Sequence, residues 1–168
     1  MSTHLATYVA LIHASEATLA DSFDTIGQGH ANHPDVLFTC QALAQMSRSH
    51  VAKLQPVVAR YGEASDVEEP QHLHASGVGE ARSGAVGLLR DLQDLHMLAT
   101  LVDSTWTVIG QGAQGLRDQE LLSIEQAARK DVSRQLAWLV TRMKSAAPQA
   151  LIVAPPVAPA ASATIRRS

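Results

Sequence analysis

The residue of this sequence best placed to do chemistry is a histidine in the middle of a long helical pattern. His50 lies at the centre of residues 46–54 (MSRSHVAKL), on a face that is otherwise apolar. Its neighbours on that face are Val36, Cys40, Leu43, Leu54, Val57 and Tyr61. In helical bundles that hold two metal ions, a carboxylate three residues before such a histidine supplies a second ligand. Ser47 occupies that position here, so the spacing of a metal motif is present without its carboxylate.

Glu16 is the second polar residue on an apolar face. It interrupts a helical series formed by Leu5, Val9, Ile12, Leu19, Phe23 and Ile26. We expect Glu16 and His50 to form a buried, charge-assisted hydrogen bond that fixes the register of two helices. An alternative is a single zinc or iron ion held by Glu16, His50 and one of His13 or His96. Asp103 lies seven residues after His96, on the same helical face, and is a further candidate ligand.

Other reactive residues offer weaker patterns. His30 with His33, and His72 with His74, fall in expected loops, where adventitious metal binding is the chemistry available to them. Cys40 is the single cysteine and can form neither an internal disulfide nor a Cys-x-x-Cys zinc site, which favours a reducing compartment. The two tryptophans, Trp106 and Trp138, are expected in the core or at an interface.

The composition favours one all-α domain. The chain has 168 residues, of which 46% are hydrophobic and only 4% aromatic, and small helix-forming residues of this kind favour closely packed helices. A net charge of -3 with mixed signs gives no basic stripe, so nucleic acid is not an expected partner. No apolar run reaches the roughly 20 residues that span a membrane, and the N-terminal residues do not resemble a signal peptide. We therefore expect a cytoplasmic protein.

Hydrophobic periodicity predicts four helices, over residues 3–29, 34–61, 84–115 and 118–147. Short connections make the first two helices, and the last two, antiparallel pairs. Residues 63–83 show no sustained periodicity, and a crossover of this length makes the second and third helices parallel. Residues 1–147 are thus expected to form the bundle. Residues 148–168, rich in alanine and proline, are expected to be a disordered tail that could dock a protein partner.

An internal repeat supports this division. The sequence IGQG at residues 26–29 recurs at residues 109–112. The same offset places Phe23 opposite Trp106, and it also pairs Leu19 with Val102, Ile12 with Leu95, Val9 with Leu92 and His13 with His96. The first and third helices therefore look like copies in two helix pairs related by an approximate two-fold axis.

Together these features resemble the ferritin-like superfamily, which includes rubrerythrins, bacterioferritins and small stress-induced bundle proteins. The resemblance covers residues 3–147 and rests locally on residues 14–19 (ASEATL) and residues 49–54 (SHVAKL), followed by YGE at 61–63. It implies a ferritin-like four-helix bundle with two antiparallel helix pairs joined by a long crossover. The family's dinuclear metal centre consists of two half-sites, each with a Glu from one helix and a Glu-x-x-His from the next. Carried onto this chain, the first half-site gives Glu16, Ser47 and His50.

The second half-site departs further from the family's pattern. The repeat puts Ala99 in the place equivalent to Glu16. The positions on the fourth helix fall on Lys130 and Ser133, or on Asp131 and Arg134 if the register is shifted by one residue. At most half of the family's ligands are then present, and a lysine or arginine pointing into the cavity would repel a metal ion.

The resemblance thus implies a homo-oligomer, formed through helix faces, whose di-iron site has decayed and which has a non-catalytic structural, stress-related or binding role. No bound cofactor is expected in this interpretation. A metal-binding protein or oxidoreductase that uses a reduced mononuclear site around Glu16 and His50 is an alternative. A scaffold or cargo protein that docks through its C-terminal tail is another.

Overall fold

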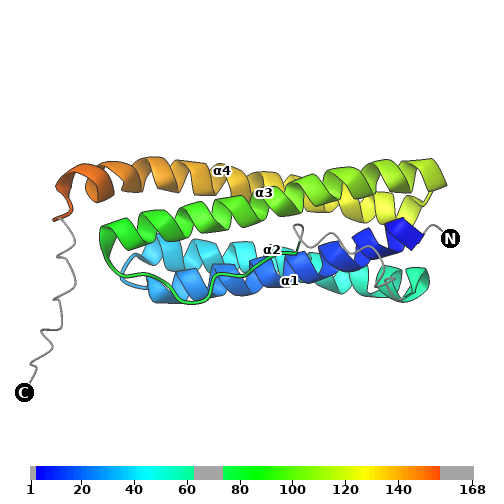
Figure 1. Cartoon of the computed structure of the whole chain (residues 1–168), viewed down its shortest axis with the longest axis horizontal. Helices are drawn as coiled ribbons and strands as arrows, with labels where there is room; N and C mark the ends of the chain where they lie inside the picture. The colour runs from blue at the N-terminus through cyan, green and yellow to red at the C-terminus, as the bar shows by residue number, and fades with distance from the viewer. Residues whose placement is uncertain (1–2, 63–73, 156–168) are drawn as a thin grey trace, which may run out of the picture.

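The chain forms an all-α four-helix bundle, as the periodicity predicted (Figure 1). The computed structural model describes residues 3–62 and 74–155. The helices are α1 (Thr3–Gly29), α2 (Pro34–Tyr61), α3 (Gly84–Leu116) and α4 (Gln119–Pro148), and a π-helical segment, η3 (Gln149–Val153), follows them. None of these described helices is both long and apolar enough to cross a membrane.

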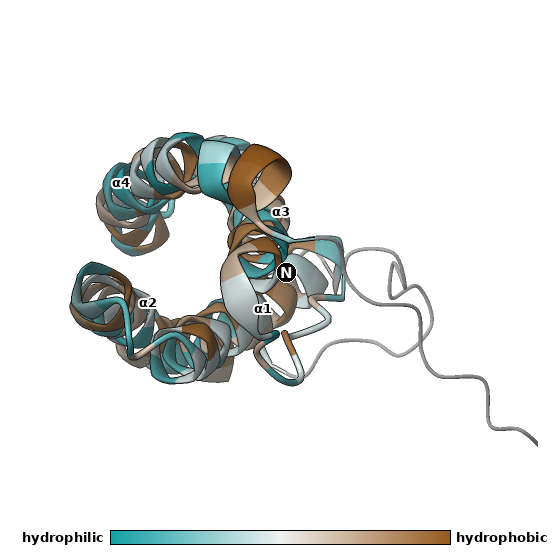
Figure 2. Ribbon diagram, turned by 90° about the vertical axis from the view of Figure 1, so that its left-hand side faces the viewer, coloured by the Kyte–Doolittle hydropathy of each residue, from teal (hydrophilic) through white to brown (hydrophobic). Residues whose placement is uncertain are grey.

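The helices are arranged as two antiparallel pairs, α1 with α2 and α3 with α4 (Figure 1). Viewed from one end, they surround the core in the order α1, α2, α4, α3 (Figure 2). The chain returns along the bundle between α2 and α3, so these two helices run parallel, as predicted from the long crossover. Residues 74–83 of the crossover are extended, whereas residues 63–73 lie outside the described part of the chain.

The helix boundaries follow from local chemistry. Pro34 lies in the first turn of α2, where a missing N–H costs nothing, and Asp35 complements the positive end of the helix dipole. The α3–α4 turn was expected at residues 117 and 118, and it forms there. Arg117 adopts a left-handed conformation with φ of 56° at the end of α3. The Asp118 carboxylate then accepts a hydrogen bond from the N–H of Leu121 and caps α4.

The end of α4 departs from the sequence prediction. Residues from 148 onward were expected to be disordered, but the chain remains helical through Pro148 and continues as η3 to Val153. Ala150 is buried and η3 packs against both α3 and α4, whereas Leu151, Ile152 and Val153 are exposed. Residues 156–168 of the expected tail lie outside the described residues.

The internal repeat corresponds to equivalent positions in the core. Six pairs that the repeat aligns on the apolar stripes of α1 and α3 are fully buried: Val9 and Leu92, Ile12 and Leu95, Glu16 and Ala99, Leu19 and Val102, Phe23 and Trp106, Ile26 and Ile109. A seventh pair combines the buried Leu88 with Leu5, which is partly buried. His13 and His96, which the repeat also aligns, are both only partly buried. The two helix pairs therefore bury their first helices in the same register.

Two glycines that the repeat aligns lie where the helices of a pair approach each other: Gly27 between α1 and α2, and Gly110 between α3 and α4. A Cβ at Gly27 would lie 2.9 Å from the Cβ of Cys40 on α2. A Cβ at Gly110, the equivalent residue of α3, would lie 2.8 Å from Oε1 of Glu125 on α4. Real Cβ atoms do not approach so closely, so glycine at position 27 permits the close approach of α1 to α2, whereas the atom that a Cβ at position 110 would meet is the end of the flexible Glu125 side chain.

We predict that Gly27→Ala destabilises the protein by about 1 kcal/mol or more, because overpacking against Cys40 outweighs the gain in helix propensity. Gly115→Ala is the matched control, since a Cβ there meets nothing within 4 Å. It should leave stability unchanged or raise it by up to about 1 kcal/mol. Urea denaturation measures both, and an equal stabilisation by the two substitutions would contradict close packing at Gly27.

Candidate functional site

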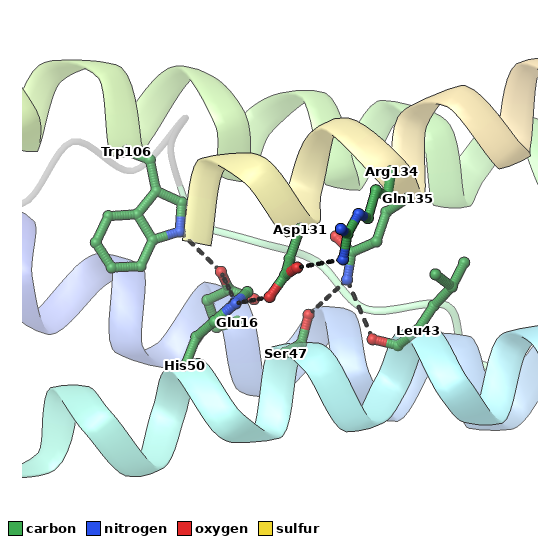
Figure 3. A network of polar contacts seen from close by, with 8 residues as sticks. All are labelled: Glu16, Leu43, Ser47, His50, Trp106, Asp131, Arg134 and Gln135. Atoms are coloured by element: carbon green, nitrogen blue, oxygen red, sulfur yellow. Dashed lines mark hydrogen bonds and ion pairs between the residues drawn. The ribbon is translucent and has the colours of Figure 1, made fainter. Parts of the chain in front are cut away.

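His50 lies between two carboxylates at the middle of the bundle (Figure 3). Its Nδ1 is 2.9 Å from Oε1 of Glu16 on α1, which confirms the predicted buried contact. Its Nε2 is 3.2 Å from Oδ2 of Asp131 on α4. The side chains of His50 and Glu16 are 1% and 0% exposed, whereas that of Asp131 is 27% exposed. One ring nitrogen of His50 thus faces a fully buried carboxylate, and the other faces a carboxylate that reaches solvent.

The third helix contributes through Trp106, whose indole N–H donates to the same oxygen of Glu16 at 2.7 Å. The Trp106 ring also packs edge-on against His50, with centroids 6.5 Å apart and planes at 86°. The sequence predicted this tryptophan as a core residue but not as a hydrogen-bond donor. All four helices therefore meet at this site, which we call the midplane network: Glu16, His50, Trp106 and Asp131.

The two carboxylates decide the protonation of His50. Burial by itself lowers the pKa of His50, but the hydrogen bonds and negative charges of Glu16 and then Asp131 outweigh it, and the pKa is raised above 6.5. Only an imidazolium can donate to acceptors at both ring nitrogens. The charged form of His50 is therefore the one that satisfies this geometry.

A second set of hydrogen bonds continues along the same side of the bundle. The side-chain amide of Gln135 on α4 donates to the carbonyl oxygen of Leu43 at 3.1 Å and to Oγ of Ser47 at 3.0 Å. Nη1 of Arg134 lies 3.3 Å from Oδ1 of Asp131, with the arginine mostly exposed. Ser47, at the position of the missing carboxylate, is thus paired with an amide (Figure 3).

The internal register of α4 corrects one sequence prediction. A shift of 85 residues carries the buried positions Val36, Cys40, Leu43, Ser47, His50, Leu54 and Tyr61 of α2 onto the buried positions Leu121, Glu125, Ala128, Val132, Gln135, Leu139 and Ala146 of α4. The equivalents of Ser47 and His50 are therefore Val132 and Gln135. The register that used Lys130 and Ser133 is wrong, since both are exposed.

The alternative register was only half right. Asp131 does reach His50, but Arg134 lies at the surface. The physical reason is the length of α3, which runs four residues past Gly112, the equivalent of the last residue of α1, while the α3–α4 connection is two residues shorter than the α1–α2 connection. The offset of 83 residues between α1 and α3 therefore grows to 85 between α2 and α4, which changes the residues of α4 that face the core.

The other predicted metal ligands do not join the midplane network. Nε2 of His13 is 3.1 Å from the side-chain oxygen of Gln55, and Asp103 faces Arg129 at 3.5 Å. His96 is partly exposed on α3. Within residues 3–62 and 74–155, no group of three or more His, Cys, Asp or Glu side chains is arranged to hold a metal ion.

The loop histidines also lie elsewhere. His30 is buried at the end of α1, with Nε2 2.7 Å from Oδ2 of Asp91, and His33 is at the start of α2. His72 lies outside the described residues, so its expected pairing with His74 is not described.

Three buried polar atoms have no hydrogen-bond partner among the described residues: Oγ of Ser15, Oε2 of Glu16 and Oε1 of Gln135. Two of the three are acceptors at the midplane. Glu16 thus uses Oε1 for both of its donors and keeps a second acceptor oxygen in the interior.

The fold and the site define an all-α four-helix bundle protein with a histidine between two carboxylates at its centre. Comparisons of the chain with protein-family models, with curated proteins and with solved structures give no match. The function is therefore inferred from the residues of the chain itself.

We predict that His50→Leu destabilises the protein by about 3 kcal/mol or more, because it leaves the Glu16 carboxylate buried without its cation. Adding Glu16→Leu should recover part of that loss, since only the indole N–H of Trp106 then lacks an acceptor, at about 1–3 kcal/mol. Asp131→Asn, at a partly exposed position, should cost less than about 1 kcal/mol. Urea denaturation of the three variants measures these changes in stability. A double variant less stable than His50→Leu would contradict the prediction.

The raised pKa of His50 predicts a pH dependence of stability. A histidine whose pKa is higher in the folded than in the unfolded state stabilises fully below the unfolded pKa of about 6.5. That stability is lost as pH rises through the folded pKa. The free energy of unfolding should therefore fall on the alkaline side of pH 6.5, and less steeply in His50→Gln. His13→Gln, on the surface of α1, is the control and should keep the wild-type slope.

Proposed function

We propose that this chain is a non-catalytic, ferritin-like bundle protein in which hydrogen-bonded side chains occupy the place of a dinuclear iron site. One observation carries the proposal: both ring nitrogens of His50 face carboxylates, Glu16 and Asp131. A metal-bound histidine gives one nitrogen to the ion and donates from the other to a carboxylate or carbonyl. Here neither nitrogen is free for an ion while both contacts are made.

The second half of the site supports the same reading. Its equivalent positions are Ala99, Val132 and Gln135, none of which carries a negative charge. Two iron ions need several carboxylates to balance and bridge their charge. This half offers one amide, and that amide already donates to Ser47 and to the Leu43 carbonyl.

The role that follows is structural, stress-related or binding, in a homo-oligomer formed through helix faces. Support for association comes from α3, where Met97 and Val108 are 70% and 52% exposed. They are separated by eleven residues, about three helical turns, and so lie on one face. Exposed apolar side chains on one helix face are a common basis for contact between copies.

A metal-binding protein or oxidoreductase with a single ion at Glu16 and His50 is the second candidate. It is favoured by Oε2 of Glu16, which is fully buried and lacks a hydrogen-bond partner among the described residues. A zinc or iron ion accepts carboxylate and imidazole ligands. Such an ion would have to displace one of the two carboxylates from the His50 ring.

Metal analysis separates the two candidates. Protein purified without a chelator or histidine tag should contain far less than one iron or zinc per chain and show no oxygen-dependent iron oxidation. About two irons per chain would contradict the first candidate. One tightly held ion that is lost in His50→Ala but kept in His96→Ala, a partly exposed histidine of α3, would favour the second.

A further inference from the structure

A pocket of about 450 Å³ opens at the end of the bundle where the α1–α2 turn, the start of α3 and the end of α4 meet, far from the midplane network. Arg142 lines it, eleven residues after Asp131, which places the two about 16 Å apart along α4. None of the described residues that line the pocket is an aspartate or glutamate. Its charged and titratable side chains are Arg142, His30 and His33, and the carboxylates of Asp35 and Asp91 that pair with Arg142 and His30 are not among the lining residues.

Arg142 is held in place by its neighbour. Its Nε donates to Oδ2 of Asp35 at 2.7 Å, and its side chain is only 14% exposed. A guanidinium carries five N–H donors in a planar fork, so a contact through Nε leaves the two terminal nitrogens for other acceptors. Arg142 therefore presents a fixed, charged donor pair of the kind that binds carboxylate and phosphate oxygens.

His30 is fixed on the opposite wall. Its side chain is 4% exposed, and its Nε2 lies 2.7 Å from Oδ2 of Asp91, which is fully buried. Asp91 also accepts hydrogen bonds from the backbone N–H and from Nη1 of Arg82, at 2.8 and 2.6 Å. The imidazole thus has one nitrogen held by a carboxylate, and His30 is one of the residues that line the pocket.

The N-terminus of α3 contributes positive partial charge to the same pocket. Ser83, the residue before the helix, makes no side-chain cap, and the first turn contains no acidic residue. The free N–H groups and positive dipole end of α3 are therefore not compensated by a side chain. Ser83, Gly84 and Ala85 line the pocket, so this positive end lies at its wall.

We propose that this pocket binds a small organic oxyanion, a carboxylate or a phosphate monoester that carries an apolar group. The charged end would lie against Arg142 and His30, and the apolar part against Leu88 and Ala146, which are buried residues of the pocket wall. A volume of about 450 Å³ is within the range of small-molecule sites. This inference goes beyond the proposed function and does not depend on the midplane network.

Calorimetric titration of the full chain with benzoate, phenyl phosphate, inorganic phosphate and neutral benzamide tests the proposal. Benzoate or phenyl phosphate should bind saturably at one site per chain, and benzamide should not bind. Arg142→Gln should weaken binding by about tenfold or more, the loss expected for a charged hydrogen bond. Arg129→Gln removes a comparably charged arginine of α4 that faces Asp103 and Glu125, and should leave binding unchanged.

Ser145→Glu gives a second variant in case Arg142→Gln does not fold. Ser145 is exposed and lines the pocket, so a glutamate there should weaken anion binding while α4 stays intact. The proposal is overturned if neither organic anion binds at millimolar concentration, if inorganic phosphate alone binds, or if a folded variant of Arg142 or Ser145 binds as the wild type does. Unchanged binding by His50→Leu would show that the pocket acts independently of the midplane network.

Discussion

The buried carboxylate of Glu16 is the constraint on which the arrangement of the helices depends. It is fully buried among apolar side chains, where an unpaired negative charge is far more costly than a packing defect. Its two donors, His50 and Trp106, come from α2 and α3. Satisfying one oxygen therefore fixes α1 against both of its neighbours at once. Apolar stripes alone specify register less sharply, because similar side chains can exchange places at small cost.

Polar contacts are concentrated where the apolar ones are weakest. The α1–α2 and α3–α4 pairs pack closely along apolar stripes, and Gly27 permits the close approach of α1 to α2. The α2–α4 side is less closely packed, and hydrogen bonds cross it instead, between His50 and Asp131 and from the Gln135 amide to Ser47. The two halves of the bundle are thus alike in the shape of their cores and unlike in charge. The half with Glu16 carries the buried Glu16–His50 pair, whereas the positions equivalent to these two residues in the other half are Ala99 and Gln135, which carry no charge.

The sequence predicted the four helices and the contact between Glu16 and His50, because both follow from hydrophobic periodicity. Glu16 and His50 are the polar exceptions on two apolar stripes, and short connections require those stripes to face each other. Asp131 and Gln135 could not be assigned in the same way. Their direction depends on where α3 ends and α4 begins, and a net difference of two residues from the α1–α2 pair changes which side chains of α4 face inward. Arg142 was missed for a different reason: its partner Asp35 lies on α2, and the pocket that it lines is formed by residues distant in the sequence, which no periodicity brings together.

The charged side chains in the interior of the bundle and those at its end differ in how readily they could bind a ligand. In the midplane network each charge faces an opposite charge of the same chain, so a ligand would first have to separate a buried pair. At the bundle end, Arg142 and His30 are also paired, but each through a single nitrogen, with other nitrogens of the same group left over. The terminal nitrogens of Arg142 are always donors, and a donor that is already held in place loses less conformational entropy when a ligand binds. The site that we propose for an anion therefore lies at the bundle end, while the midplane network links all four helices in the interior.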